Sequence, residues 1–184
     1  MMASASPFTG VQGWLTDEEE QMISRYASRV PGDGVIVNIG VEYGRSMAAI
    51  ITNAFKSVSV IGVEIAPKDE FDENMRRTGL SGRYKLVTGD SKEVGRKWTT
   101  PIDMIFIDGA HEYENVKGDI EQWARHVKPG GFILFHDVAC MSNKMPHPLH
   151  HEVSRAINEW FAGKEHMWRI VNMADSVMVF KRVG

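Results

Sequence analysis

The chain has 184 residues, of which 43% are hydrophobic and 24% are charged, and its formal net charge is -3. This length fits one domain with a full-sized core, so we expect a single domain over residues 1–184. The charge balance gives no reason to expect nucleic acid or an anionic membrane as a partner, and a single cysteine, Cys140, excludes an intrachain disulfide.

The first residues lack the basic and apolar regions of a secretory signal. No apolar run approaches the roughly 20 residues that span a bilayer. We therefore expect a cytoplasmic protein without a membrane segment.

Residues 1–30 are expected to form a loose lead-in followed by a helix. Residues 1–13 are small and polar, and Thr16 followed by Glu19 is a capping-box pattern. The pattern predicts a helix that runs to about Val30, where a Pro-Gly-Asp-Gly turn stops it.

Five short apolar runs then alternate with helix-like stretches. Strands that are apolar on both faces and alternate with helices indicate a buried, mostly parallel sheet with helices on both sides. The predicted strands are 35–40, 57–65, 84–90, 102–108 and 132–137. The predicted helices between them are 47–55, 68–78, 91–98 and 112–126.

The pattern changes after Asp137. Residues 138–151 read as an irregular, lid-like loop, and a helix follows over about 152–161. Two strand-like runs, 167–173 and 176–182, are joined by a link so short that it favours an antiparallel hairpin. The sequence therefore predicts a Rossmann-like, doubly wound α/β fold with seven strands.

In such a sheet the ligand lies beyond the carboxyl ends of the strands. Gly40 and Gly44 flank the turn after the first strand, where backbone can approach a ligand and Ser46 can add a hydroxyl. A turn that only joins strand to helix is the alternative. Glu64 ends the second strand, 24 residues after Gly40, and can accept hydrogen bonds from both hydroxyls of a ribose.

The third and fourth strands end in further polar residues. Asp90 could accept a hydrogen bond from an adenine amino group, and Ser91 is placed either beside the adenine or as a helix cap. Asp108 ends the fourth strand, and His111 lies three residues on, where it could serve as a general base. A local packing role is the alternative for His111.

The fifth strand ends in His136 and Asp137, which should reach the same cleft as Asp108. Two neighbouring carboxylates repel each other unless a proton, a cation or a substrate amine lies between them. Oxygen ligands of this kind suit Mg²⁺, so we consider a metal at Asp108 and Asp137, with His136 as a weaker ligand. The alternative is that Asp137 simply caps the loop.

The remaining candidate residues have less specific sequence patterns. For His147, His150 and His151 we favour a polar lid or a helix start over a metal site, because no matching ligand pattern accompanies them. Trp14 and Met22 could line the cleft if the first helix folds over it.

The motifs NIGVEYGRS, VIGVEI, LVTGDS, MIFIDGAHEYENVKGDI and VKPGGFILFHD resemble those of the class I S-adenosylmethionine (SAM)-dependent methyltransferases. More narrowly, the endings I-D-G-x-H and G-G-x-x-x-x-H-D resemble a small O-methyltransferase-like group that includes macrolide-sugar and cephalosporin-pathway enzymes. The resemblance covers about residues 35–137. It implies a strand order of 3-2-1-4-5-7-6 with strand seven antiparallel.

The resemblance also implies roles for the strand-end residues. The turn from Gly40 to Gly44 would approach the methionine part of SAM, and Asp108 and Asp137 match the family's divalent-metal positions. The chain departs from the family at Asn38, where an acid is usual, and at Glu42, which replaces a glycine. The residues expected beside the cofactor are Asn38, Gly40, Glu42, Gly44, Ser46, Glu64, Asp90, Ser91 and Asp108.

We therefore expect an O-methyltransferase that acts on a hydroxylated small molecule, with His111 and Asp108 as catalytic residues and Mg²⁺ as a further cofactor. The alternatives are a nucleotide-linked oxidoreductase on a related fold and a SAM-binding protein without catalysis. A homodimer would form through the first helix or the terminal hairpin. The acceptor itself has no recognisable sequence code.

Overall fold

The computed structural model describes residues 4–6, 9–138 and 148–184, and its centre is a seven-stranded sheet. The strands are β3 (Val35–Ile39), β4 (Ser59–Glu64), β5 (Lys85–Thr88), β6 (Ile102–Ile107), β7 (Val127–Phe135), β8 (Trp168–Ala174) and β9 (Val177–Arg182). Their order is β5-β4-β3-β6-β7-β9-β8, and only β9 runs antiparallel to its neighbours. Counted along the chain, this is 3-2-1-4-5-7-6, so the predicted topology is confirmed.

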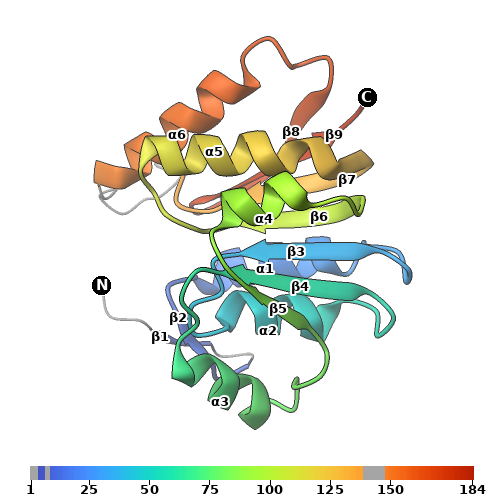
Figure 1. The fold of residues 1–184 in the computed structure, drawn as a ribbon, viewed down its shortest axis with the longest axis vertical. Helices are drawn as coiled ribbons and strands as arrows, with labels where there is room; N and C mark the ends of the chain where they lie inside the picture. The colour runs from blue at the N-terminus through green and yellow to red at the C-terminus, as the bar shows by residue number, and fades with distance from the viewer. Residues whose placement is uncertain (1–3, 7–8, 139–147) are drawn as a thin grey trace.

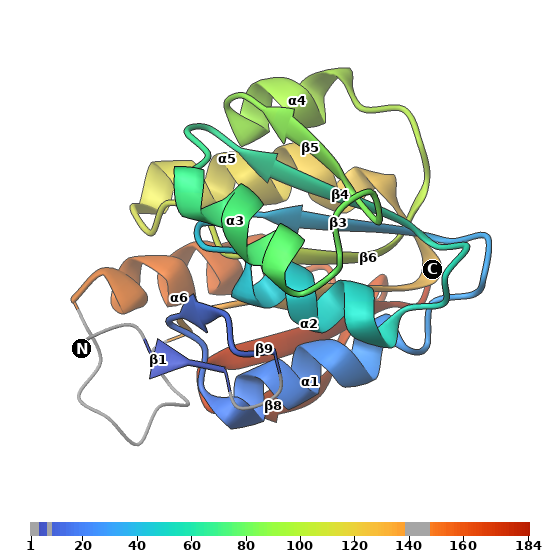
Figure 2. The same cartoon turned by 90° about the horizontal axis from the view of Figure 1, so that it is seen from below.

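Helices cover both faces of the sheet (Figures 1 and 2). They are α1 (Asp17–Ala27), α2 (Arg45–Asn53), α3 (Asp69–Arg77), α4 (Ser91–Lys97), α5 (Tyr113–Trp123) and α6 (Pro148–Phe161), with a 3-10 turn η1 (Ala124–His126) after α5. The core residues of α1, α2 and α3 pack on one face, and those of α5 and α6 pack on the other. Among the described residues, no helix is both long and apolar enough to cross a bilayer.

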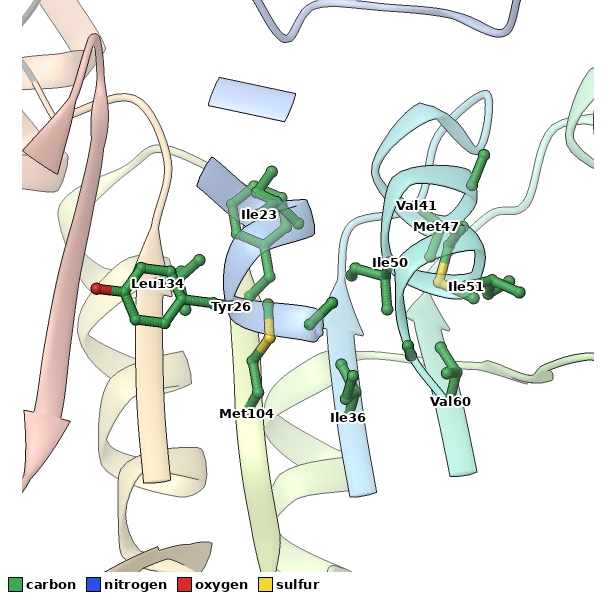
Figure 3. Close-up of a cluster of buried hydrophobic side chains, with 14 of the residues drawn as sticks. Ile23, Tyr26, Ile36, Val41, Met47, Ile50, Ile51, Val60, Met104 and Leu134 are labelled. Atoms are coloured by element: carbon green, nitrogen blue, oxygen red, sulfur yellow. The ribbon is translucent and has the colours of Figure 1, made fainter. Parts of the chain in front are cut away.

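The side-chain alternation of the strands divides the core between these two layers. Ile36 and Leu134 face α1 and α2, whereas Val37 and Ile133 face the α5 and α6 side. Figure 3 shows the first layer, in which Ile23 and Tyr26 of α1 and the apolar side of α2 meet the strands. Because the central strands β3, β4 and β6 are buried on both faces, the polar residues at their ends are left at the rim of the sheet.

Three boundaries differ from the sequence prediction. β7 begins at Val127, five residues early, because Val127 pairs with Ile102 of β6. The lead-in is not wholly irregular, since β1 (Ser4–Ala5) and β2 (Gln12–Gly13) form a small antiparallel sheet. Residues 148–151 of the predicted lid-like loop belong to α6, and 139–147 lie outside the described residues, as does His147.

Candidate functional site

A cavity of about 760 Å³ opens at the carboxyl ends of β3, β4, β5, β6 and β7. Its volume lies in the usual range for small-molecule and cofactor sites. Its wall also includes the segment 12–15, in which Trp14 is 52% exposed. The predicted residues that line it are Gly40, Glu42, Ser46, Glu64, Asp90, Ser91, Asp108, His111, His136 and Asp137.

The turn after β3 is fixed by close backbone packing. Gly40 has a φ of 77°, and a Cβ added there would stand 2.0 Å from the carbonyl oxygen of Asp108. Gly44, with a φ of 95°, instead faces α3, where a Cβ would stand 2.6 Å from Met75 Cε. Gly44 is not among the residues that line the cavity, and its close neighbours are side chains of α3.

Asn38, also expected beside the cofactor, is likewise not among the residues that line the cavity. It is completely buried on the α2 side of β3, and its Nδ2 donates a hydrogen bond of 2.8 Å to Ser46 Oγ. Among the described residues, Asn38 Oδ1 has no hydrogen-bond partner. Asn38 therefore acts on the cavity through Ser46, which does line it.

Glu64 holds the glycine turn from the neighbouring strand. Its Oε2 accepts hydrogen bonds from the backbone nitrogens of Val41 (3.0 Å) and Glu42 (3.3 Å). Glu42 has a φ of 41°, and its carboxylate lies 2.8 Å from Lys68 Nζ. The Glu64 carboxylate is thus oriented at the cavity wall before any ligand arrives.

Asp90, rather than Ser91, caps α4. Asp90 Oδ1 accepts hydrogen bonds from the backbone nitrogens of Lys92 (2.8 Å) and Glu93 (3.4 Å). Ser91 is the first helical residue, and its hydroxyl donates to Asp119 of α5. Asp119 lines the cavity and was not singled out from the sequence, because its contacts join segments 28 residues apart.

His136 is buried among three carboxylates. Its Nδ1 lies 2.8 Å from Asp108 Oδ1 and 3.3 Å from Asp137 Oδ2, and its Nε2 lies 3.3 Å from Glu19 Oε2. Burial alone lowers the pKa of His136, but Asp108 and the other two carboxylates outweigh it and raise the pKa well above 6.5. Burial raises the pKa of Asp108, whereas contacts with His111 and His136 overcome burial and lower the pKa of Asp137. His136 therefore lies between the aspartate pair at its Nδ1 and Glu19 at its Nε2, which favours the protonated imidazolium.

Two further histidines flank Asp137. His111 Nε2 lies 2.9 Å from Asp137 Oδ2, and His150 Nε2 of α6 lies 3.1 Å from Asp137 Oδ1. The contact with Asp137 raises the pKa of His111, against an opposing effect of burial. The sequence interpretation of His150 as part of a polar lid missed this contact, because its signal was confined to the local pattern MPHPLHHEV.

The cluster fits a divalent ion. Asp108, His111 and Asp137 each offer one ligand atom, and these three atoms lie within 4.8 Å of one another. Carboxylate oxygens and an imidazole nitrogen are ordinary ligands of divalent metals. His136 is not in this group, since carboxylates occupy both of its ring nitrogens.

Glu19 ties this cluster to the rest of the fold. The sequence predicts its capping box with Thr16, and the structure confirms it. Glu19 Oε1 also accepts a hydrogen bond of 3.0 Å from the backbone nitrogen of Ser176, in the turn between β8 and β9. Met22, one turn later, lies in the apolar core rather than in the cleft, so its expected place is corrected.

Glu19→Gln should lower the free energy of unfolding by roughly 3 kcal/mol, because it breaks a buried ion pair with His136. Burial raises the pKa of Glu19, but contacts with His136 and Ser176 outweigh it and lower the pKa to about 2 from 4.5. The contribution is therefore present above pH 4.5 and is lost as the pH falls towards 2. Urea unfolding at several pH values measures it.

Glu18→Gln is the control for this experiment. Glu18 is an exposed neighbour on the same helix. If both variants lose equal stability at pH 7, or if the loss in Glu19→Gln does not shrink in acid, the ion pair is not the cause.

Comparison of the chain with known proteins identifies its family. The family described as a methyltransferase domain matches residues 37–138, more than half of the chain. An uncharacterised protein of Acanthamoeba polyphaga mimivirus is 30% identical over 115 residues, 57% of this chain and 52% of that protein. An uncharacterised protein of Sinorhizobium fredii is 42% identical over 36 residues, 20% of this chain and 4% of that protein. The chain thus spans at most about half the length of these two relatives.

Solved structures share the fold. The O-methyltransferase TomG of Streptomyces achromogenes, in complex with SAM, has a TM-score of 0.73 and 14% identity, with 93% of this chain and 82% of that chain covered. An O-methyltransferase of Bacillus cereus, in complex with S-adenosylhomocysteine (SAH), has a TM-score of 0.71 and 18% identity, with 92% and 83% covered. The chain belongs to the methyltransferase domain family.

Proposed function

We propose that this chain transfers the methyl group of SAM to a hydroxyl oxygen of a small molecule. The observation that carries the proposal is one cavity of about 760 Å³ that gathers Glu64, Asp90, Asp108 and His111 from the ends of three different strands, β4, β5 and β6. These strand ends are far apart in sequence, and a ligand with both a nucleoside and a reactive end would contact all of them.

The cofactor would lie along the rim of the sheet. Glu64, held by the turn after β3, would accept hydrogen bonds from the ribose hydroxyls. The backbone from Gly40 to Glu42, with Ser46, would approach the methionine part, and the adenine would lie beside Asp90 and Ser91. The sulfonium methyl group would then face Asp108, His111 and Asp137.

The reaction would be a direct displacement. The acceptor oxygen must lie in line with the bond from sulfur to methyl carbon, which is mainly a matter of positioning. His111 would take the hydroxyl proton as general base, while Asp108 orients the acceptor. Asp137 would hold the His111 ring through their 2.9 Å contact.

A divalent cation, with Mg²⁺ as the ion that the family resemblance implies, would be held by Asp108 and Asp137. It would supply positive charge that lowers the pKa of an acceptor hydroxyl and orients it. His136, as a buried cation, already balances part of the charge of the two aspartates.

Calorimetry with SAH should show saturable binding to this protein, and NAD should give none. Glu64→Gln should weaken SAH binding by about 10–100-fold, because a hydrogen bond to a charged acceptor is lost. Glu70→Gln, an exposed acid on α3, is the control and should bind like the parent protein. Binding of NAD without SAH would favour an oxidoreductase and contradict the proposal.

Catalysis needs its own measurement. Release of SAH from SAM in the presence of a panel of hydroxylated small molecules would identify an acceptor. SAH binding without methyl transfer to any of them would favour a SAM-binding protein without catalysis. The same samples, analysed by light scattering, test the homodimer.

A further inference from the structure

A buried carboxylate of α5, Asp119, faces the end of the cavity at which the adenine is proposed to lie. Asp119 is only 3% exposed, yet it lines the cavity together with Ser91 and Gly109. Carboxylates are rarely buried to this degree unless hydrogen bonds or counter-charges satisfy them. The question is therefore what satisfies Asp119.

The contacts of Asp119 with described residues engage one of its two carboxylate oxygens, and the other faces the cavity. Oδ1 accepts a hydrogen bond from the Ser91 hydroxyl. Oδ2 lies beneath Gly109, where an added Cβ would stand only 3.3 Å from it, so the loop above offers no side chain to meet it. Burial raises the pKa of Asp119 to about 6, and Ser91 and Lys92 only partly offset this effect. The carboxylate is thus short of donors.

Asp90, the acid expected from the sequence to meet the adenine, is engaged differently. Its Oδ1 caps α4 through the backbone nitrogens of Lys92 and Glu93, and its Oδ2 lies 3.5 Å from Lys92 Nζ. Its side chain is 39% exposed, so water competes for what remains of its hydrogen-bonding capacity. Asp119 is the drier of the two acids, and a hydrogen bond there gains more from the low local dielectric.

We propose that Asp119 is the carboxylate that selects the adenine base, by accepting a hydrogen bond from its exocyclic amino group. Ser91 acts as a positioning residue that holds Asp119 Oδ1 and leaves Oδ2 for the base. This inference rests on the proposed function, since it requires that SAM occupy the cavity. It predicts discrimination against a purine that carries a carbonyl oxygen in place of the amino group, because two acceptors would then face each other.

Calorimetry with SAH and with S-inosylhomocysteine, whose base has a carbonyl oxygen in place of the amino group and a hydrogen on N1, tests the proposal. The parent protein should prefer SAH by about 100-fold or more. Asp119→Asn should lose at least tenfold of this preference, because an amide can donate to the carbonyl oxygen of the inosine base. Glu121→Gln, an exposed acid on the same helix, is the control and should keep the full preference.

Other results would overturn the inference. If Asp119→Asn binds SAH and keeps the preference, Asp119 does not read the base, and the proposed function is untouched. If Asp90→Asn removes the preference instead, Asp90 is the selecting acid. If the parent protein binds neither compound, the proposed function fails as well. Thermal unfolding reports whether Asp119→Asn folds, and Ser91→Ala, which leaves the carboxylate in place, should also reduce the preference.

Discussion

Replacing His111 with alanine is expected to lower kcat by about 10²–10⁴-fold, the usual contribution of a general base. His111 lines the cavity next to Asp108, and its Nε2 lies 2.9 Å from Asp137 Oδ2. SAH affinity should stay within about threefold of the parent value, because the general base acts on the acceptor and does not hold the cofactor. Single-turnover kinetics with SAM and an acceptor measures both effects.

The pH dependence gives a second test of His111. A base must be neutral to accept a proton, so kcat should rise with pH as His111 loses its proton. Contact with the Asp137 carboxylate raises the pKa of His111, so the midpoint should lie above the ordinary value of 6.5. This rise should be missing in His111→Ala.

His151→Ala is the matched control, since His151 is an exposed histidine of α6. It should retain both kcat and the pH profile. The affinity for Mg²⁺ separates two roles of His111, general base and metal ligand, because its ring also belongs to the group that could hold an ion. If His111 is only a base, His111→Ala should leave the dissociation constant for Mg²⁺ unchanged. If His111 is a ligand, the dissociation constant should rise. Full activity in His111→Ala would show that another group takes the proton.

The buried parallel part of the sheet was predictable because its strands come from short apolar runs that alternate with helices. The order of the seven strands came from the family resemblance. An apolar run such as 102–108 is typical of a strand that is buried on both faces of a parallel sheet. The short link after residue 173 favours an antiparallel hairpin at the edge of the sheet. The ends of a strand were less predictable where hydrogen-bonded pairing with a neighbouring strand decides them. Val127 joins β7 because its partner Ile102 is available, and no local pattern in Val-Lys-Pro-Gly-Gly indicates that.

The site was predictable to the extent that strand ends converge. Glu64, Asp90 and Asp108 end their strands, and the structure brings them to one cavity. The residues that were missed, Glu19, Asp119 and His150, lie on helices. Asp119 lines the cavity, whereas Glu19 and His150 contact the lining residues His136 and Asp137. Their positions in helices follow local rules, such as the capping box of Glu19. These rules do not reveal a contact with a residue that is distant in the sequence.

Two residues expected beside the cofactor do not line the cavity. Asn38 and Gly44 belong to the expected cofactor turn, but Asn38 points to Ser46 and Gly44 packs against α3. Alternation along a strand reverses the face at every residue, so a polar residue two positions before the strand end can lie behind the site. Gly40 differs, because its close neighbour is the backbone of the loop that carries Asp108 and His111.

Gly40→Ala is expected to disable the site and destabilise the protein together. The added Cβ would stand 2.0 Å from the carbonyl oxygen of Asp108, far inside any allowed contact, and the φ of 77° is strained for alanine. The loop that carries Asp108 and His111 must then move away from β3. We expect SAH affinity to fall about 100-fold or more, and the free energy of unfolding to fall by about 4 kcal/mol or more.

Gly79→Ala separates the backbone strain from the collision. Gly79 has a φ of 71°, close to that of Gly40, but a Cβ there meets nothing within 4 Å. It should therefore cost only the strain of the left-handed conformation, about 1–2 kcal/mol, and leave SAH binding unchanged. Urea unfolding and calorimetry on both variants measure the difference. If Gly40→Ala costs no more than Gly79→Ala and still binds SAH, the turn after β3 does not set the position of Asp108, and close packing of these two loops is not what assembles the site.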